Sequence, residues 1–178
     1  MKRRTTRFLL WTGLAVLILA GAGAVLWVRT FRHYTPKEVM ADVRAGLKAR
    51  HIQDPQARVE AFLEARYGPL TEPANRERAF LDFYNPDHIK GLRFIVSHTP
   101  ASQKQANTQA MAQWIANYRN TMSPEERAAL QASLSSEAGS AMLRQATAQY
   151  QSQDIHFRSD QKAVIRELMT TLAALRQP

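Results

Sequence analysis

The sequence predicts an all-α protein, with one N-terminal transmembrane helix followed by a soluble domain of about six to eight irregularly arranged helices. Residues 8–28 form an apolar run without any charge, and the rest of the chain repeatedly places a helix N-cap residue directly before proline. In addition, no stretch shows the alternation of apolar β-branched and polar residues that is typical of a half-buried strand.

The apolar run 8–28 has the length of a membrane helix, because about 20 apolar residues are needed to cross the hydrocarbon core of a bilayer. Trp11 and Trp27 lie near its two ends, where interfacial aromatic residues are common. The alternative is a cleaved signal peptide, since the segment 20–24 contains small-x-small sites. The run continues through Val28, which would leave an apolar mature N-terminus, so we favour a retained signal anchor.

Basic residues on either side of the run predict its orientation. The segment 1–7 is the more densely basic flank, and such flanks stay in the cytoplasm. We therefore expect a single-pass protein of a cell inner membrane, with a basic linker at 29–35 and a periplasmic helical domain at 36–178. The residues expected at the membrane interface are Arg3, Arg4, Arg7, Trp11, Trp27, Arg29, Arg32 and Lys37.

Small residues within the predicted anchor give one interaction signal. Such residues let transmembrane helices approach closely, which favours packing against a partner helix. They are also common in membrane helices generally, and they match a cleavage site. The residues expected to pack are Ala20, Gly21, Gly23 and Ala24.

The net charge of +9 is concentrated near the predicted membrane. Residues 1–50 carry ten Lys or Arg against two Asp or Glu, whereas residues 51–178 carry fourteen against thirteen. The excess therefore fits contact with anionic lipid headgroups. No basic stripe with interleaved aromatic residues follows, so no nucleic-acid partner is expected.

Helix starts are marked by strong N-cap residues followed by proline, which is favoured at the first helical position. Glu38 and Glu126 each complete a capping box. Pro73, with Thr71 or Glu72 before it, predicts another start, and Ser159 predicts a cap without proline. The five cap-proline pairs are Thr35-Pro36, Asp54-Pro55, Asn85-Pro86, Thr99-Pro100 and Ser123-Pro124.

Apolar residues at helical spacing follow each of these starts. Gly68-Pro69 stops the second helix, and a break is expected around 135–139. The stripes, in order, are Val39, Val43 and Leu47; Val59, Phe62, Leu63 and Tyr67; Phe80, Phe83 and Tyr84; Ile89, Leu92, Ile95 and Val96; Ala110, Trp114, Ile115 and Tyr118; Leu130, Leu134, Met142, Ala146 and Tyr150; and Val164, Ile165, Leu168, Leu172 and Leu175.

The predicted core is thin. Leu, Ile, Val and Phe make up 27 of residues 33–178, which is near the lower limit for a folded domain. Two Gln- and Ala-rich stretches, 103–113 and 145–153, fit either a solvated helix surface or contact with another protein.

The sequence contains few motifs that indicate a catalytic or metal-binding site. The five histidines lack the spacings that place two imidazoles on one metal ion, and the sequence has no cysteine, no GxSxG and no phosphate-binding loop. The candidates are Asp87, His88 and His98, where a His–carboxylate pair would bind a metal or act as a base. The alternative for Asp87 is a helix-dipole role in the first turn of a helix.

We therefore expect a non-catalytic accessory, stabilising or assembly subunit of a larger inner-membrane protein complex. It would act through packing of the transmembrane helix and docking of the helical domain. The alternative is a membrane-tethered or secreted periplasmic chaperone or sensor that binds other proteins. No cofactor and no small-molecule substrate are expected, and the partners are the lipid bilayer and the larger complex.

Overall fold

The computed structural model describes residues 37–175, which contain nine helices and no strand. The all-α prediction is confirmed for this part of the chain, with nine helices in place of the expected six to eight. They are α2 (Lys37–Ala49), α3 (Pro55–Tyr67), α4 (Pro73–Asp82), α5 (Pro86–Ser97), α6 (Ala101–Thr121), α7 (Pro124–Ser135), α8 (Glu137–Gln151), α9 (Ile155–Asp160) and α10 (Lys162–Leu175).

The predictions for the first 36 residues concern a segment outside the described residues. They are the transmembrane helix, its packing residues, the interface residues up to Arg32, and the Thr35-Pro36 cap. Within residues 37–175, no helix is both long and apolar enough to cross a membrane.

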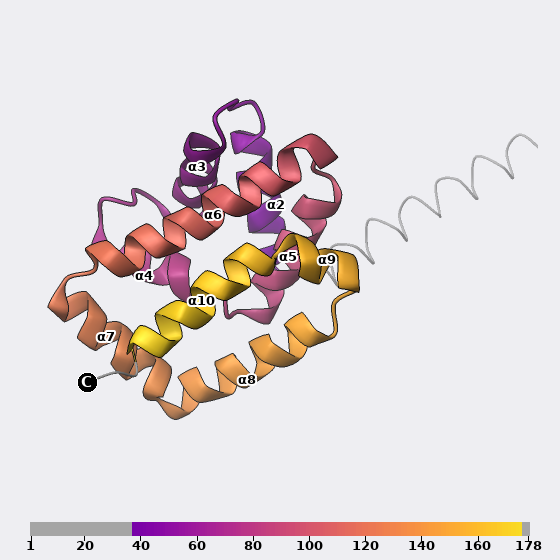
Figure 1. The fold of residues 1–178 in the computed structure, drawn as a ribbon. Helices are drawn as coiled ribbons and strands as arrows, with labels where there is room; N and C mark the ends of the chain where they lie inside the picture. The colour runs from indigo at the N-terminus through magenta and orange to yellow at the C-terminus, as the bar shows by residue number, and fades with distance from the viewer. Residues whose placement is uncertain (1–36, 176–178) are drawn as a thin grey trace, which may run out of the picture. The chain divides into compact units, whose positions relative to one another are not determined.

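The long helix α6 organises the domain (Figure 1). It packs against α3 and α10, and α2 packs against α3 and α5. The chain then turns through α7 into α8, which returns to pack against α5. Because α6 has neighbours on more than one side, its buried residues are spread around the helix, and several of them are alanines that allow close approach.

Aromatic residues form much of the core. Phe80 lies 5.5 Å from Tyr118 and 5.6 Å from Tyr84, measured between ring centroids. Trp114 lies 5.8 Å from Tyr118 and 6.3 Å from Phe83. The thin-core expectation counted only Leu, Ile, Val and Phe, so it left out the Tyr and Trp rings that fill this space.

Three of the predicted N-caps have the expected hydrogen bonds. Asp54 accepts from the Ala57 N–H at 2.7 Å, and Asn85 accepts from the Asp87 N–H at 3.0 Å. The Ser123 capping box is complete, since the Ser123 hydroxyl accepts from the Glu126 N–H at 3.1 Å and the Glu126 carboxylate accepts from the Ser123 N–H at 2.8 Å.

The predicted break between α7 and α8 is also confirmed. Ser136 follows the last residue of α7, and its hydroxyl caps α8 by accepting from the Gly139 N–H at 3.0 Å. The predicted end of the second helix is confirmed as well. Gly68 ends α3, and its φ of 98° favours glycine.

Two predicted caps are wrong. Thr99 does not cap α6, because its hydroxyl donates to the Ile95 carbonyl of the preceding helix at 2.8 Å, and Pro100 occupies the N-cap position instead. Ser159 lies inside α9, which is capped by Asp154; α9 is helical there because Phe157 is buried in the core. At the start of α4, Glu72 holds the N-cap position without a side-chain cap bond.

Ion pairs join helices that are distant in sequence. Arg76 of α4 lies 2.7 Å from Glu126 of α7, and Arg119 of α6 lies 3.0 Å from Glu167 of α10. Both pairs are largely shielded from solvent, which strengthens them relative to exposed surface pairs.

Candidate functional site

A histidine and an aspartate meet in the interior between α5 and α2. The Nδ1 atom of His88 lies 3.0 Å from the Asp42 carboxylate, and neither side chain is exposed. Gly91, one turn after His88, makes this approach possible: a Cβ atom added there would lie 2.2 Å from the Asp42 Oδ2 atom. Glycine therefore occupies a helix interior at this position because there is no room for a side chain.

Arg66 of α3 extends this pair into a buried cluster. Its Nε atom donates to Asp42 at 2.9 Å, and its Nη2 atom lies 3.5 Å from the Asp82 carboxylate of α4. The Tyr67 hydroxyl donates to the same Asp82 carboxylate at 3.0 Å. One guanidinium thus lies between two carboxylates, and this interior cluster links α2, α3, α4 and α5.

The Tyr67 hydroxyl keeps its proton within this cluster. Burial is the main cause that raises the pKa of Tyr67 above its ordinary value, and the negative charges of Asp82 and Asp42 raise it further. A protonated hydroxyl is a donor, which is the role that the Asp82 carboxylate requires.

A His–Asp pair is also the arrangement in which a carboxylate orients a general base. For that role, the second ring nitrogen must reach a substrate. The Nε2 atom of His88 is buried and has no hydrogen-bond partner among residues 37–175. The ring is instead packed edge-on to Phe83 at 5.5 Å and to Tyr67 at 6.5 Å. The surroundings of His88 are those of a core residue.

The three candidate residues from the sequence have separate partners. Asp87 forms an ion pair with Lys90 at 2.8 Å, in the first turn of α5. His98 follows the end of α5, where its Nδ1 atom lies 2.8 Å from the Phe94 carbonyl oxygen and its ring lies 4.2 Å from the Phe94 ring. The structure therefore does not bring Asp87, His88 and His98 together.

The charged residues Asp42 and Arg66 of this cluster were not identified from the sequence. Asp42 lies between the apolar residues Val39 and Val43, and Arg66 follows Leu63 by three positions, so each charge belongs to a buried helix face. The sequence signal that could have found them is a charged residue within an apolar stripe, which indicates a buried charge. The spacing could not predict that Asp42 pairs with Arg66, because these two residues are 24 positions apart.

Metal binding has no candidate in the described part of the chain, where no three His, Asp or Glu residues form a group that could hold a metal ion. Comparison with models of protein families, with curated proteins and with solved structures gives no match.

Proposed function

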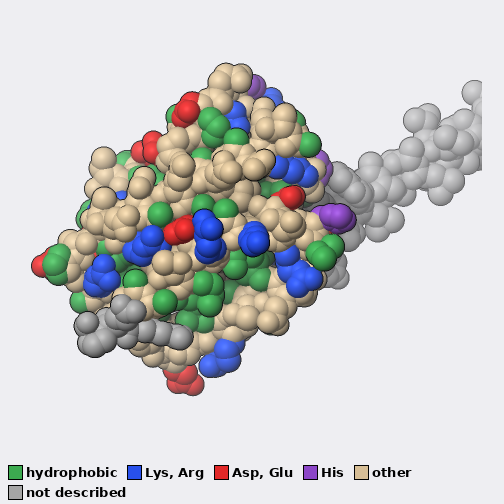
Figure 2. Space-filling model, viewed as in Figure 1, with side chains coloured by type: hydrophobic (Ala, Val, Ile, Leu, Met, Phe, Trp, Pro, Cys, Tyr) green, Lys and Arg blue, Asp and Glu red, His purple; other side chains and the backbone are tan. Residues whose placement is uncertain are grey.

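We propose that this chain is a non-catalytic accessory subunit of a larger membrane protein complex, and that its helical domain binds the partner through a hydrophobic surface between α8 and α10. The main observation behind this proposal is a group of hydrophobic side chains on the surface. In Figure 2 they gather between these helices, next to a row of Lys and Arg side chains. We call this surface the α8/α10 band and define it by the half-buried Met142, Leu143 and Tyr150 of α8, the half-buried Ile165 and Leu172 of α10, and the exposed Met169 of α10.

The α10 side of the band is a second apolar stripe on that helix. One face of α10 is buried through Val164, Leu168 and Leu175. Met169 and Leu172 are three positions apart, so they share a neighbouring face. Met169 is 61 % exposed although it is a large apolar side chain. Met169 is thus a large apolar side chain in solvent beside the half-buried Ile165 and Leu172, which fits a surface that another protein covers.

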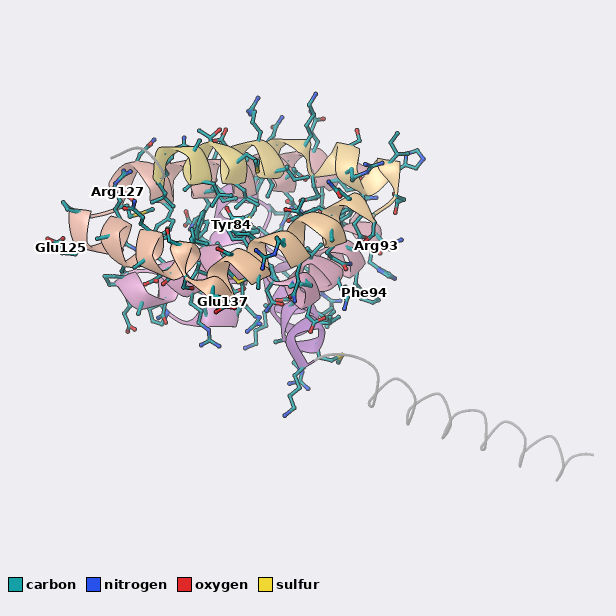
Figure 3. All side chains as sticks on the ribbon, turned by 90° about the horizontal axis from the view of Figure 1, so that it is seen from below. Tyr84, Arg93, Phe94, Glu125, Arg127 and Glu137 are labelled. Carbon is teal, nitrogen blue, oxygen red and sulfur yellow. The ribbon has the colours of Figure 1, made fainter. Side chains whose placement is uncertain are left out.

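The floor of the band is polar but uncharged. The Tyr84 hydroxyl lies between α8 and α10 in Figure 3 and donates to the Leu168 carbonyl at 3.3 Å. Burial, together with the neighbouring Tyr150, raises the pKa of Tyr84 above its ordinary value, so this hydroxyl stays neutral. Burial also raises the pKa of Tyr150. A neutral floor favours an apolar partner segment over a charged one.

The membrane part of the proposal rests on the composition of residues 8–28 and on the basic flanks. A single anchor would hold the domain near the bilayer, so a partner in the same membrane would meet it at high effective concentration. The hypothesis that the chain is an enzyme is less well supported. The side chain of His88 in the His–Asp pair is 0 % exposed, so a substrate would not reach it.

The experiment is a mild-detergent extraction of the tagged full chain from native membranes, followed by mass spectrometry of the intact assembly. We expect a stoichiometric partner with the unchanged chain and its loss with Met169→Glu. Thr170→Glu is the matched control, because Thr170 is exposed and adjacent to Met169 on α10 but faces about 100° away. If both variants keep the partner, the band is not the docking surface. A mixed set of substoichiometric clients would favour the chaperone alternative.

A further inference from the structure

A second surface feature lies on another part of the domain. A cavity of about 180 Å³ opens between α2, α3, α5 and α6. Its walls are apolar and include Val59, Phe62, Leu92, Ile95 and Met111. It therefore offers room for an apolar group inside a small helical domain, where interiors are otherwise closely packed.

The lining of the cavity carries positive charge. Arg50 is exposed and Lys104 half-buried, and we call these two residues the rim, whereas Arg58 lines the cavity as a buried residue. None of the described residues that line the cavity is Asp or Glu. Lys104 and Arg50 have no ion pair within residues 37–175. Lys104 also lines a neighbouring polar hollow and is partly exposed to solvent.

Arg58 is held in place by its own hydrogen bonds. It donates to the carbonyls of Ile52 at 2.6 Å and Gln53 at 2.9 Å, and to the Asn107 side-chain oxygen at 2.7 Å. The bond to the oxygen of Asn107 leaves the amide NH₂ group of Asn107 as a donor at the cavity wall. The cavity thus combines the fixed positive charge of Arg58, the positive charges of the rim and an amide donor.

We infer that this cavity binds a single-chain anionic amphiphile, with the apolar chain inside and the anionic head at Lys104, Arg50 and Asn107. The volume sets the length of the chain. An apolar cavity of about 150 Å³ accepts benzene, so one of this size holds roughly six to eight carbon atoms. The charge of the rim selects an anion over a neutral alcohol of the same length. This is a binding site and requires no reaction.

The test is calorimetric titration of the full chain in phosphatidylcholine nanodiscs, with empty nanodiscs as the blank. The probes are octanoate, octyl phosphate and 1-octanol. We expect both anions to bind at least about tenfold more tightly than 1-octanol, which has the same chain and no charge. A preference for octanoate would identify free fatty acids as the ligand, and a preference for octyl phosphate would identify phosphorylated lipids.

The variant Lys104→Met keeps an unbranched side chain and removes the charge. We expect it to weaken octanoate binding about tenfold while 1-octanol binding stays within about twofold. Lys48→Met is the matched control, since Lys48 is an exposed residue of α2 outside the cavity lining. The inference is overturned if octanoate does not bind, if it binds no more tightly than 1-octanol, or if Lys48→Met has the same effect as Lys104→Met.

Discussion

Replacing Gly91 with alanine is expected to destabilise the domain, although the same change normally stabilises a helix interior by about 1 kcal/mol. The new Cβ atom would lie 2.2 Å from the Asp42 Oδ2 atom and 2.9 Å from the Asp42 Cβ and Cγ atoms. Asp42 is fully buried and bonded to Arg66 and His88, so moving it away from the new Cβ atom would disturb both of those contacts.

The size of the effect follows from three contributions. Overpacking costs about 1–3 kcal/mol, and weakening a hydrogen bond to a charged group costs about 1.5–3 kcal/mol. The helix propensity of alanine offsets about 1 kcal/mol. We therefore expect Gly91→Ala to lower the free energy of unfolding by about 1.5–5 kcal/mol. At about 3 °C per kcal/mol for a domain of this size, that corresponds to a fall in Tm of about 5–15 °C.

The assay is thermal unfolding of the full chain in detergent, followed by circular dichroism at 222 nm. Gly46→Ala is the matched control, because a Cβ atom at Gly46 would make an ordinary 3.4 Å contact with the Ile95 side chain. Asp42→Ala and the double variant complete a cycle, and we expect the double variant to cost less than the sum, by about 0.5–3 kcal/mol. An unchanged or higher Tm for Gly91→Ala would refute the tight fit of Asp42 against α5.

The remaining predictions concern stability and use the same assay. The hydrogen bond from the Ser123 N–H, assisted by Arg76, lowers the pKa of Glu126, so its stabilising contribution is present above the ordinary carboxyl pKa and is lost as the pH falls through the lowered value. Glu126→Gln should cost about 1 kcal/mol at pH 7 and nothing at low pH, and a pH-independent cost would contradict this reasoning. Gly68→Ala should cost about 1–3 kcal/mol because φ is 98° there, and no loss would show that the turn relaxes. Leu130→Ala should cost about 2–5 kcal/mol because Leu130 is fully buried, whereas the exposed Leu47→Ala should change stability by less than about 0.5 kcal/mol.

Local signals predicted the helical fold well. Asp54, Asn85 and Ser123 cap helices as expected, because a cap residue before proline satisfies backbone groups within one turn of itself. Thr99 was predicted wrongly because its hydroxyl donates to a carbonyl of the preceding helix, and Pro100 holds the N-cap position of α6. Ser159 was predicted wrongly because burial of Phe157 decides where that helix lies.

The interior polar cluster was much less predictable. His88 was noticed as a residue type, but its partner Asp42 lies 46 positions away. Tertiary packing brings the two together, and Gly91 is the local sequence feature that allows it. The same holds for the α8/α10 band, since the spacing of Met169 shows that it shares a stripe with Leu172 but not that Met169 itself stays exposed.

We propose that the helical domain acts by docking through the α8/α10 band. The decisive measurement is the mass of the intact assembly extracted from native membranes, for the unchanged chain, Met169→Glu and Thr170→Glu. We expect one stoichiometric complex for the unchanged chain and Thr170→Glu, and the free chain for a folded Met169→Glu variant. A free chain in all three samples would contradict it.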